Sequence, residues 1–150
     1  MSYKGFYRIK NPQKYKGDHK NCIFRSLWER KFMKYCDENT NVLEWSSEEV
    51  RIPYISPIDN RRHTYFVDFL MKVKDRENKT KTYLIEIKPK RQTEKPLVVE
   101  GKKMTSGLKK QIATYIINKS KWEAAKDYCE NRGWKFVIIT EKTLFGKNSK

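Results

Sequence analysis

Charged residues interrupt the two most strand-like segments of this chain. Asp68 lies within the apolar run at residues 65–70, and Glu86 and Lys88 lie within a second run at residues 83–88. A carboxylate without a partner is strongly disfavoured in an apolar environment, so charges placed there need a reason. If the two strands pair, Asp68 and Glu86 converge. The pattern indicates a metal-binding site, and metal-dependent phosphodiester cleavage is the first hypothesis.

The spacing of these residues suits that chemistry. Side chains alternate across a strand, so Glu86 and Lys88 share one face and the isoleucines beside them share the other. Two carboxylates and a backbone carbonyl suit Mg²⁺ or Mn²⁺. Lys88 would then orient or deprotonate a water, or hold the scissile phosphate. The alternative is that Asp68 and Glu86 pair with Lys72, Lys88 or arginines on a solvated face.

Glu29 is a further candidate carboxylate, on a helix predicted before the strands. It could contribute to the metal site or orient a water there. The same residue completes a capping box with Ser26, which would occupy it at the helix start. Both interpretations stay open at this point.

The charge balance points to a polyanionic partner. Lys and Arg total 34 against 18 Asp and Glu, a formal net charge of +16. Nucleic acid fits best, because neutralising phosphates releases counterions and gives affinity without base reading. A merely adhesive basic surface is the alternative.

Several classes of protein are disfavoured by the sequence. It has no apolar stretch of about 18 residues or more and no hydrophobic signal-peptide region, so we expect a cytoplasmic protein without a membrane span. Its three cysteines show no CxxC spacing, which disfavours a disulfide framework or zinc knuckle and predicts reduced thiols.

Hydrophobic periodicity predicts one domain with two terminal extensions. Residues 1–22 form a basic aromatic arm that could stack on bases but is expected to pack on its own domain. Residues 142–150 form a basic tail. Between them, the patterns predict a helix at 26–38, short strands at 42–45 and 50–54, an antiparallel hairpin of strands 65–74 and 81–88, a helical stripe at 104–116, a helix at 120–132 stopped by Gly133, and a strand at 134–140.

The ordered set Glu29, Asp68, Glu86, Lys88, with Gln111 and Tyr115 four residues apart on the helix after the hairpin, resembles the PD-(D/E)xK nuclease superfamily. Val67 stands where that motif usually has proline. Residues 26–96 look like the catalytic domain of TnsA-type transposon-end endonucleases. The size, the basic arm and the Glu-Ile-Lys-Pro motif of the whole chain are similar to the head-completion nucleases of T-even-type tailed phages.

The resemblance implies an α/β restriction-endonuclease-like fold, with a mixed central sheet flanked by helices in the order α-β-β-β-α-β, over residues 23–141. It implies a Mg²⁺-dependent DNA endonuclease with Mn²⁺ as a substitute ion and no small-molecule cofactor. Asp68 and Glu86 would be metal ligands, Lys88 the catalytic lysine and Glu29 the helix carboxylate. In the phage branch, the enzyme would act on packaged DNA or its protruding end before neck and tail attach. It would work in the host cytoplasm or in the virion, with portal, neck or capsid proteins as partners.

Further residues are predicted to contact DNA. Gln111 and Tyr115 share a helix face and could touch a phosphate or the edge of the site. His63 precedes the Asp68 strand and could assist a phosphate or a water. A basic cluster after the motif is expected to follow the DNA backbone, with Lys90, Arg91, Lys103 and Lys110 as its chosen members.

Two competing functions remain at this stage. One is a transposon-end or junction-specific endonuclease that takes its sequence choice from a partner. The other is a catalytically silent DNA-binding head protein that kept the fold. Intact Asp68, Glu86 and Lys88 argue against the silent protein, because a disused site has no reason to keep costly charges.

Overall fold

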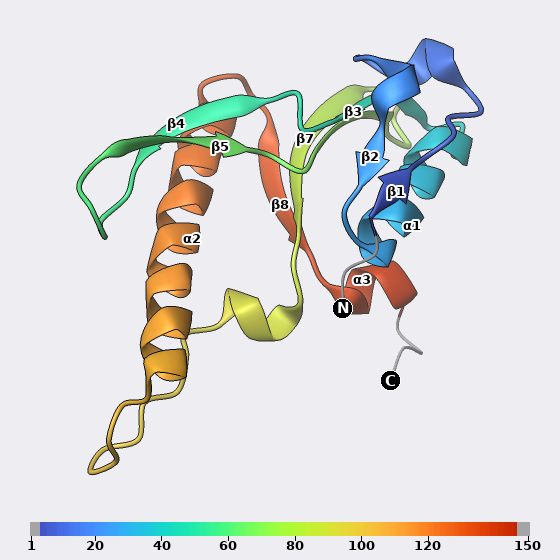
Figure 1. Ribbon diagram of the computed structural model, residues 1–150. Helices are drawn as coiled ribbons and strands as arrows, with labels where there is room; N and C mark the ends of the chain where they lie inside the picture. The colour runs from blue at the N-terminus through green and yellow to red at the C-terminus, as the bar shows by residue number, and fades with distance from the viewer. Residues whose placement is uncertain (1–3, 147–150) are drawn as a thin grey trace.

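A four-stranded mixed sheet lies at the centre of the computed structural model, which describes residues 4–146 (Figure 1). Its strand order is β3-β6-β7-β8, with antiparallel pairs β3/β6 and β6/β7 and a parallel pair β7/β8. The strands are β3 Val42–Ser47, β6 Phe69–Lys74, β7 Thr80–Ile87 and β8 Lys135–Ile139. The parallel β7/β8 pair needs a crossover connection, and helix α2 (Ser106–Glu130) provides it.

The sheet is covered on both faces by apolar side chains. Helix α1 (Leu27–Glu38) lies on one side and α2 on the other. Phe32 and Met33 of α1 pack with Ile85 and Ile87, while Trp122 of α2 packs with Leu84. Successive side chains along β7 therefore pack into two different cores, one on each face of the sheet. Taken in chain order, α1, β3, β6, β7, α2 and β8 confirm the predicted α-β-β-β-α-β core.

The prediction of one strand over residues 65–74 was wrong. The chain forms β5 (Arg62–Phe66), breaks at Val67 and Asp68, and continues as β6 in the central sheet. β5 pairs instead with β4 (Arg51–Ile55) in a separate hairpin that lies across α2 in Figure 1. At the break, Val67 N donates to Val50 O at 3.0 Å and Glu48 N donates to Asp68 O at 3.0 Å. These bonds turn the chain from one sheet into the other.

The prediction of two helices between residues 104 and 132 was also wrong, because α2 is one helix of 25 residues. Thr105 caps its start by accepting from Leu108 N, and Ser120 lies inside the helix. No glycine or proline interrupts residues 108–130, and burial of Trp122 and Cys129 favours continuation. Gly133, with φ of 72°, follows the helix end as predicted.

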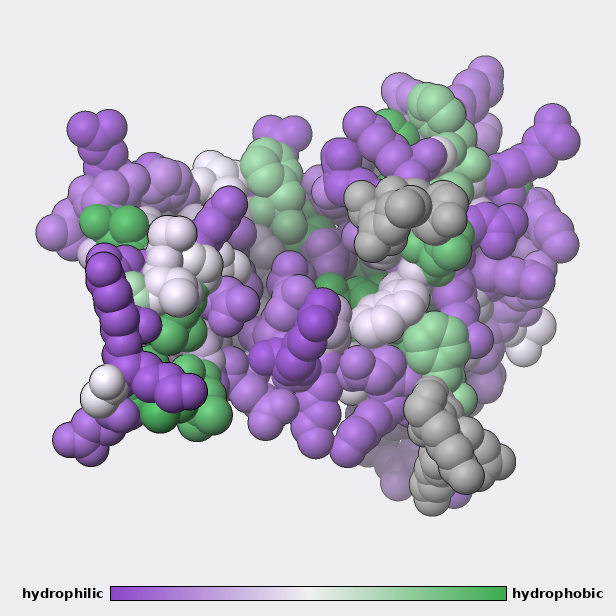
Figure 2. Space-filling view, turned by 60° about the horizontal axis from the view of Figure 1, so that its bottom comes forward, coloured by the Kyte–Doolittle hydropathy of each residue, from purple (hydrophilic) through white to green (hydrophobic). Residues whose placement is uncertain are grey.

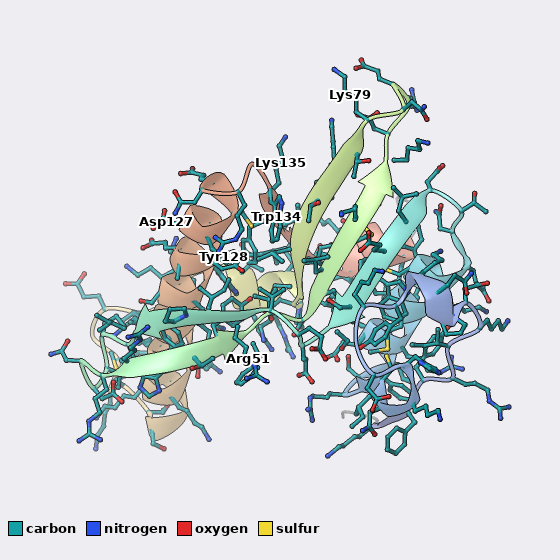
Figure 3. The ribbon with its side chains drawn as sticks, turned by 90° about the horizontal axis from the view of Figure 1, so that it is seen from above. Arg51, Lys79, Asp127, Tyr128, Trp134 and Lys135 are labelled. Atoms are coloured by element: carbon teal, nitrogen blue, oxygen red, sulfur yellow. The ribbon has the colours of Figure 1, made fainter. Side chains whose placement is uncertain are left out.

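The end of α2 is anchored to the start of β8 by aromatic side chains. Tyr128 and Trp134 lie side by side in Figure 3, with ring centroids 6.0 Å apart. The Arg132 guanidinium lies 3.4 Å from the Tyr128 ring centroid. These contacts fix the long helix against the sheet edge.

The N-terminal segment packs into the core on the α1 side. β1 (Gly5–Phe6) pairs with β2 (Ile23–Phe24), and two short 3₁₀ helices, η1 Pro12–Lys14 and η2 His19–Asn21, lie between them. Tyr7 and Tyr15 are buried, and Tyr15 meets Trp45 edge to face at 4.7 Å. The preference for packing over base stacking is confirmed for these two tyrosines. Residues 1–3 of the predicted arm lie outside the described part.

The segment after β8 forms a short helix, α3 (Glu141–Phe145), where a basic tail was expected from residue 142. Leu144 packs on the α1-side core, and the Phe145 ring lies 5.9 Å from that of Trp28. Residues 147–150 lie outside the described part. All three cysteines are free and buried, as predicted. None of the helices in residues 4–146 is both long and apolar enough to cross a membrane.

Asp37 should be a main determinant of stability. Its fully buried carboxylate accepts from Tyr7 Oη at 3.0 Å, Lys10 N at 2.8 Å and Asn11 N at 2.9 Å, which ties the N-terminal segment to α1. Asp37→Ala is expected to lower the free energy of unfolding by about 3 kcal/mol, because buried donors lose a charged acceptor. Urea denaturation measures this change. The control Glu38→Ala removes an exposed ion pair and should cost less than about 1 kcal/mol; equal losses would contradict the role of Asp37.

Candidate active site

A pocket of about 230 Å³ opens where the β5–β6 break meets β7 and α2. Three of the four predicted catalytic residues, Asp68, Glu86 and Lys88, line it together. Figure 2 shows a face of the molecule covered largely by polar side chains, in keeping with the basic composition. The remaining lining residues are Thr64, Tyr65, Phe66, Asn118, Lys121 and Trp122.

Asp68 is held at the pocket by the backbone of the neighbouring strand. Its Oδ2 accepts from Ile87 N at 2.8 Å, so the break between β5 and β6 aims the carboxylate at β7. Burial, reinforced by the charge of Glu86, raises the pKa of Asp68 well above its usual range. Two acids that line one pocket and are both largely buried favour a bound cation or a shared proton.

Glu86 is buried on the face of β7 that meets α2. It accepts a hydrogen bond from Tyr65 Oη through Oε1, and its Oε2 lies 3.4 Å from Lys88 Nζ. Burial, followed by the charge of Glu86, raises the pKa of Tyr65, so the phenol stays a donor. The Lys88 side chain is 29% exposed, which leaves its ammonium accessible from the pocket. Glu86 and Lys88 therefore share a face, as the alternation along the strand predicts.

Glu29 lies in the first turn of α1 and does not line the pocket. Its N–H donates to Ser26 Oγ at 3.1 Å, and its Oε1 accepts from Arg25 N at 3.2 Å. The first is the N-cap bond of a capping box, whereas the second goes to Arg25, one residue before the N-cap, in place of the N–H of Ser26. Burial raises the pKa of Glu29, and the nearby charges of Glu48 and Glu86 add to the effect. Glu29 thus lies near the acid pair while one of its oxygens serves the helix.

The donor set fits a hard divalent cation. Within residues 4–146 there is no cluster of three or more His, Cys, Asp or Glu arranged as a ready metal cage. Mg²⁺ does not require one, since it commonly takes one or two carboxylates, several waters and substrate phosphate. Asp68 and Glu86 supply two such carboxylates, and a cation between them would relieve the repulsion that raises the pKa of Asp68.

Most of the predicted DNA contacts lie along a second groove. This groove, of about 580 Å³, runs between α2 and the 3₁₀ helix η3 (Lys90–Thr93). Its lining includes four predicted DNA-binding residues: Arg91, Lys110, Gln111 and Tyr115.

The other three predicted DNA contacts lie elsewhere. Lys90 N donates to Glu141 Oε1 at 2.9 Å, next to the groove, and exposed Lys103 lies in the loop before α2. His63 lies on the β4–β5 hairpin, where its Nε2 is 2.8 Å from Asp59 Oδ2 and its ring stacks on Tyr54. His63 does not line the catalytic pocket.

Sequence reasoning missed the other six lining residues, of which Tyr65, Asn118 and Lys121 bear on the chemistry. Asn118 lines both hollows, while Lys121 and Tyr65 line the catalytic pocket alone. Asn118 follows Gln111 and Tyr115 at helical spacing, so extending their shared face by one turn would have found it. Tyr65 gave no signal, because its contact with Glu86 depends on the break after β5.

The chain belongs to the TnsA-like endonuclease family, because residues 39–141 match the family described as TnsA-like endonuclease N terminal. With the mixed sheet and its flanking helices, this match defines a restriction-endonuclease-like protein of the PD-(D/E)xK class. The chain is also 38% identical over 148 residues to the head completion nuclease of Enterobacteria phage T4, covering 96% of this chain and 95% of that protein. Membership implies a nuclease, and both expected resemblances are confirmed.

The range of the family match includes some of the predicted catalytic residues and leaves one out. It includes Asp68, Glu86 and Lys88 and continues to residue 141, well past the stretch 26–96 in which the TnsA likeness was expected. It begins at residue 39, so Glu29 lies outside it.

Asp68→Asn should stabilise the protein at neutral pH in the presence of a chelator. Because the pKa of Asp68 is raised on folding, its favourable contribution is fully present below about pH 3.9 and is lost as the pH rises through the folded-state pKa. Asparagine avoids the buried charge and can still accept from Ile87 N. Thermal melts across this pH range should show a gain at pH 7 that fades towards pH 4.

Asp75→Asn provides a matched control with the opposite sign. Backbone donation from Lys79 lowers the pKa of this partly buried carboxyl in the β6–β7 turn, so its substitution should bring no gain at pH 7. A stabilising Asp75→Asn, or an Asp68→Asn that destabilises at pH 7, would contradict the electrostatic account of the pocket.

Proposed function

We propose that this protein is a Mg²⁺-dependent DNA endonuclease that acts in phage head completion, on packaged DNA or its protruding end before the neck and tail attach. The observation that carries the proposal is the convergence of Asp68, Glu86 and Lys88 in one pocket beside a basic groove. The role in head completion rests on the likeness to a protein of that name over nearly the whole length of both chains. The site of action is the host cell during assembly, with portal, neck or capsid proteins nearby.

In this proposal, Asp68 and Glu86 hold Mg²⁺, with Mn²⁺ as a substitute. When bound, the ion supplies charge stabilisation at the phosphoryl oxygens and lowers the pKa of a water. Tyr65 donates to Glu86 and fixes the orientation of its carboxylate. Lys88 is held 3.4 Å from Glu86 and presents its ammonium to the scissile phosphate, where it offsets the charge of the transition state.

In this proposal, the residues that bind DNA differ from the residues that cleave it. Asp68 and Glu86 are the acids of the catalytic pocket, whereas Arg91 and Lys110 line the groove beside it. Lysine and arginine bind the DNA backbone by neutralising phosphates, independently of sequence. Binding should therefore survive the loss of the acids.

A transposon-end endonuclease is the second candidate, and the TnsA-like match over residues 39–141 favours it.

Asp68→Ala and Glu86→Ala should each abolish cleavage of linear or branched DNA while leaving DNA binding intact. Lys88→Ala should slow cleavage by about 10²- to 10⁴-fold. Gel assays with Mg²⁺, Mn²⁺ or EDTA measure the cutting, and fluorescence anisotropy in EDTA measures the binding. Asp75→Ala, in the β6–β7 turn and outside the pocket lining, is the control and should cut normally. Cutting by Asp68→Ala, or cutting by the wild type in EDTA, would overturn the proposed mechanism.

Binding should be steeply salt-dependent and nearly indifferent to sequence. If six or more phosphates are neutralised, affinity falls by about 10³-fold or more between roughly 50 and 200 mM salt. Arg91→Ala and Lys110→Ala should each reduce the slope of log affinity against log salt by about 1. Lys79→Ala is the control, since Lys79 lies at the tip of the β6–β7 hairpin, away from the groove (Figure 3). A shallow slope with strong sequence preference would indicate base readout instead.

A further inference from the structure

The groove along α2 is larger and more varied in its lining than a surface that binds only DNA phosphates. Its volume of about 580 Å³ falls in the range of about 300–1,000 Å³ that is typical of sites for whole small molecules. It adjoins the catalytic pocket at Asn118, which lines both hollows. A group in the groove therefore lies next to a group held beside Asp68 and Glu86.

The groove lining includes neutral polar groups without protein partners. Asn118 is only 7% exposed, and neither its amide nor that of Gln111 has a hydrogen-bond partner within residues 4–146. Tyr115 is half-buried, and no aromatic pairing involves it in the same part of the chain. The amide of Asn118 lines the groove and is therefore free to donate to, and accept from, a polar ligand that enters it.

The groove lining also carries charges of both signs. Arg91 and Lys110 can hold phosphate, whereas Glu94, also in the lining, would repel one. A carboxylate does accept hydrogen bonds from the amino groups of a nucleobase. An aromatic ring, two free amides, a carboxylate and two cations together match a nucleotide, with the base on Tyr115 and the phosphates on Arg91 and Lys110.

We infer that this groove binds one unpaired nucleotide of the DNA strand whose phosphodiester lies in the catalytic pocket. The base stacks on Tyr115 and offers its edge to Gln111 and Asn118. A base in a paired duplex cannot enter such a groove without leaving its stack. The substrate class is therefore DNA with unpaired nucleotides at the cut, such as a single strand, a frayed end or a fork. This inference rests on the proposed nuclease function.

Lys121 continues the same track into the catalytic pocket. It lies one helical turn beyond Asn118, with its Nζ 5.6 Å from the Tyr65 ring centroid and 5.9 Å from that of Tyr54. It forms no ion pair with an acid in residues 4–146. Its position suits the phosphate that connects the unpaired nucleotide to the scissile bond.

The test compares DNA of one sequence in three forms: a single strand, a fork and a relaxed covalently closed duplex circle. Binding is measured in EDTA, so that it does not depend on catalysis, and 2-aminopurine in the oligonucleotides reports stacking by quenching of its fluorescence. The wild type should bind the single strand and the fork at least about tenfold more tightly than the closed duplex and should quench 2-aminopurine. With Mg²⁺, it should cut in the same order.

Tyr115→Leu should lose the quenching and weaken single-strand binding by roughly tenfold or more, while leaving duplex binding unchanged. Tyr115→Phe should keep both. Gln111→Ala changes an exposed side chain, so it should fold normally and weaken single-strand binding alone. Tyr35→Leu, which alters a tyrosine 49% exposed on α1, is the matched control and should behave as the wild type.

The outcomes separate this inference from the proposed function. Equal binding and cutting of all three DNA forms without quenching would overturn the unpaired-nucleotide site and leave the nuclease standing. Equal losses of single-strand and duplex binding in Tyr115→Leu and Gln111→Ala would also overturn it. Quenching that depends on Tyr115 in a protein that cuts no DNA would support the groove and refute the nuclease.

Discussion

The hydrogen bond from Ile87 N to Asp68 Oδ2 joins the two parts on which this structure depends. At 2.8 Å, it ties the break between β5 and β6 to the strand that carries Glu86 and Lys88. If β5 continued straight into β6, Asp68 would sit in a regular ladder and its direction would follow the pleat. The break frees the carboxylate to accept from the C-terminal end of β7. The same contact brings two acids together, so the local geometry that completes the sheet also creates the electrostatic cost that a cation would relieve.

Alternation along β7 sorts core residues from site residues. Ile85 and Ile87 enter the α1-side core, whereas Glu86 and Lys88 face the pocket beside α2. A shift of one residue in register would turn both charges towards the α1-side core and both isoleucines towards the catalytic pocket. The hydrophobic energy that fixes the register therefore also positions the acid and the lysine. Placing α2 over that face brings Asn118 and Lys121 to the same pocket.

The central elements were predictable because each has a strong local pattern. The alternating run at β7 and the amphipathic stripe of α1 gave both their type and their place. The β5–β6 break was missed because residues 65–74 look like one continuous strand. The turn at Asp68 is set by backbone hydrogen bonds to Glu48 and Val50, which lie far away in the sequence, so local propensity does not show it. The continuity of α2 was missed because Ser120 and Glu123 resemble a cap, while burial of Trp122 against the sheet decides otherwise.

Glu29 has a hydrogen-bonded role at the start of α1, and its role as a carboxylate of the site stays a prediction. The sequence left a choice between a helix cap and a metal-site acid, and the structure shows the N-cap bond at Ser26 and a second bond at Arg25. These bonds use the N–H and Oε1, and no partner in residues 4–146 occupies Oε2. The influence of Glu86 on the pKa of Glu29 indicates that the two carboxyl groups lie within electrostatic range. The two roles are therefore compatible, and a capped Glu29 would approach the acid pair with less freedom to lose than an unrestrained side chain.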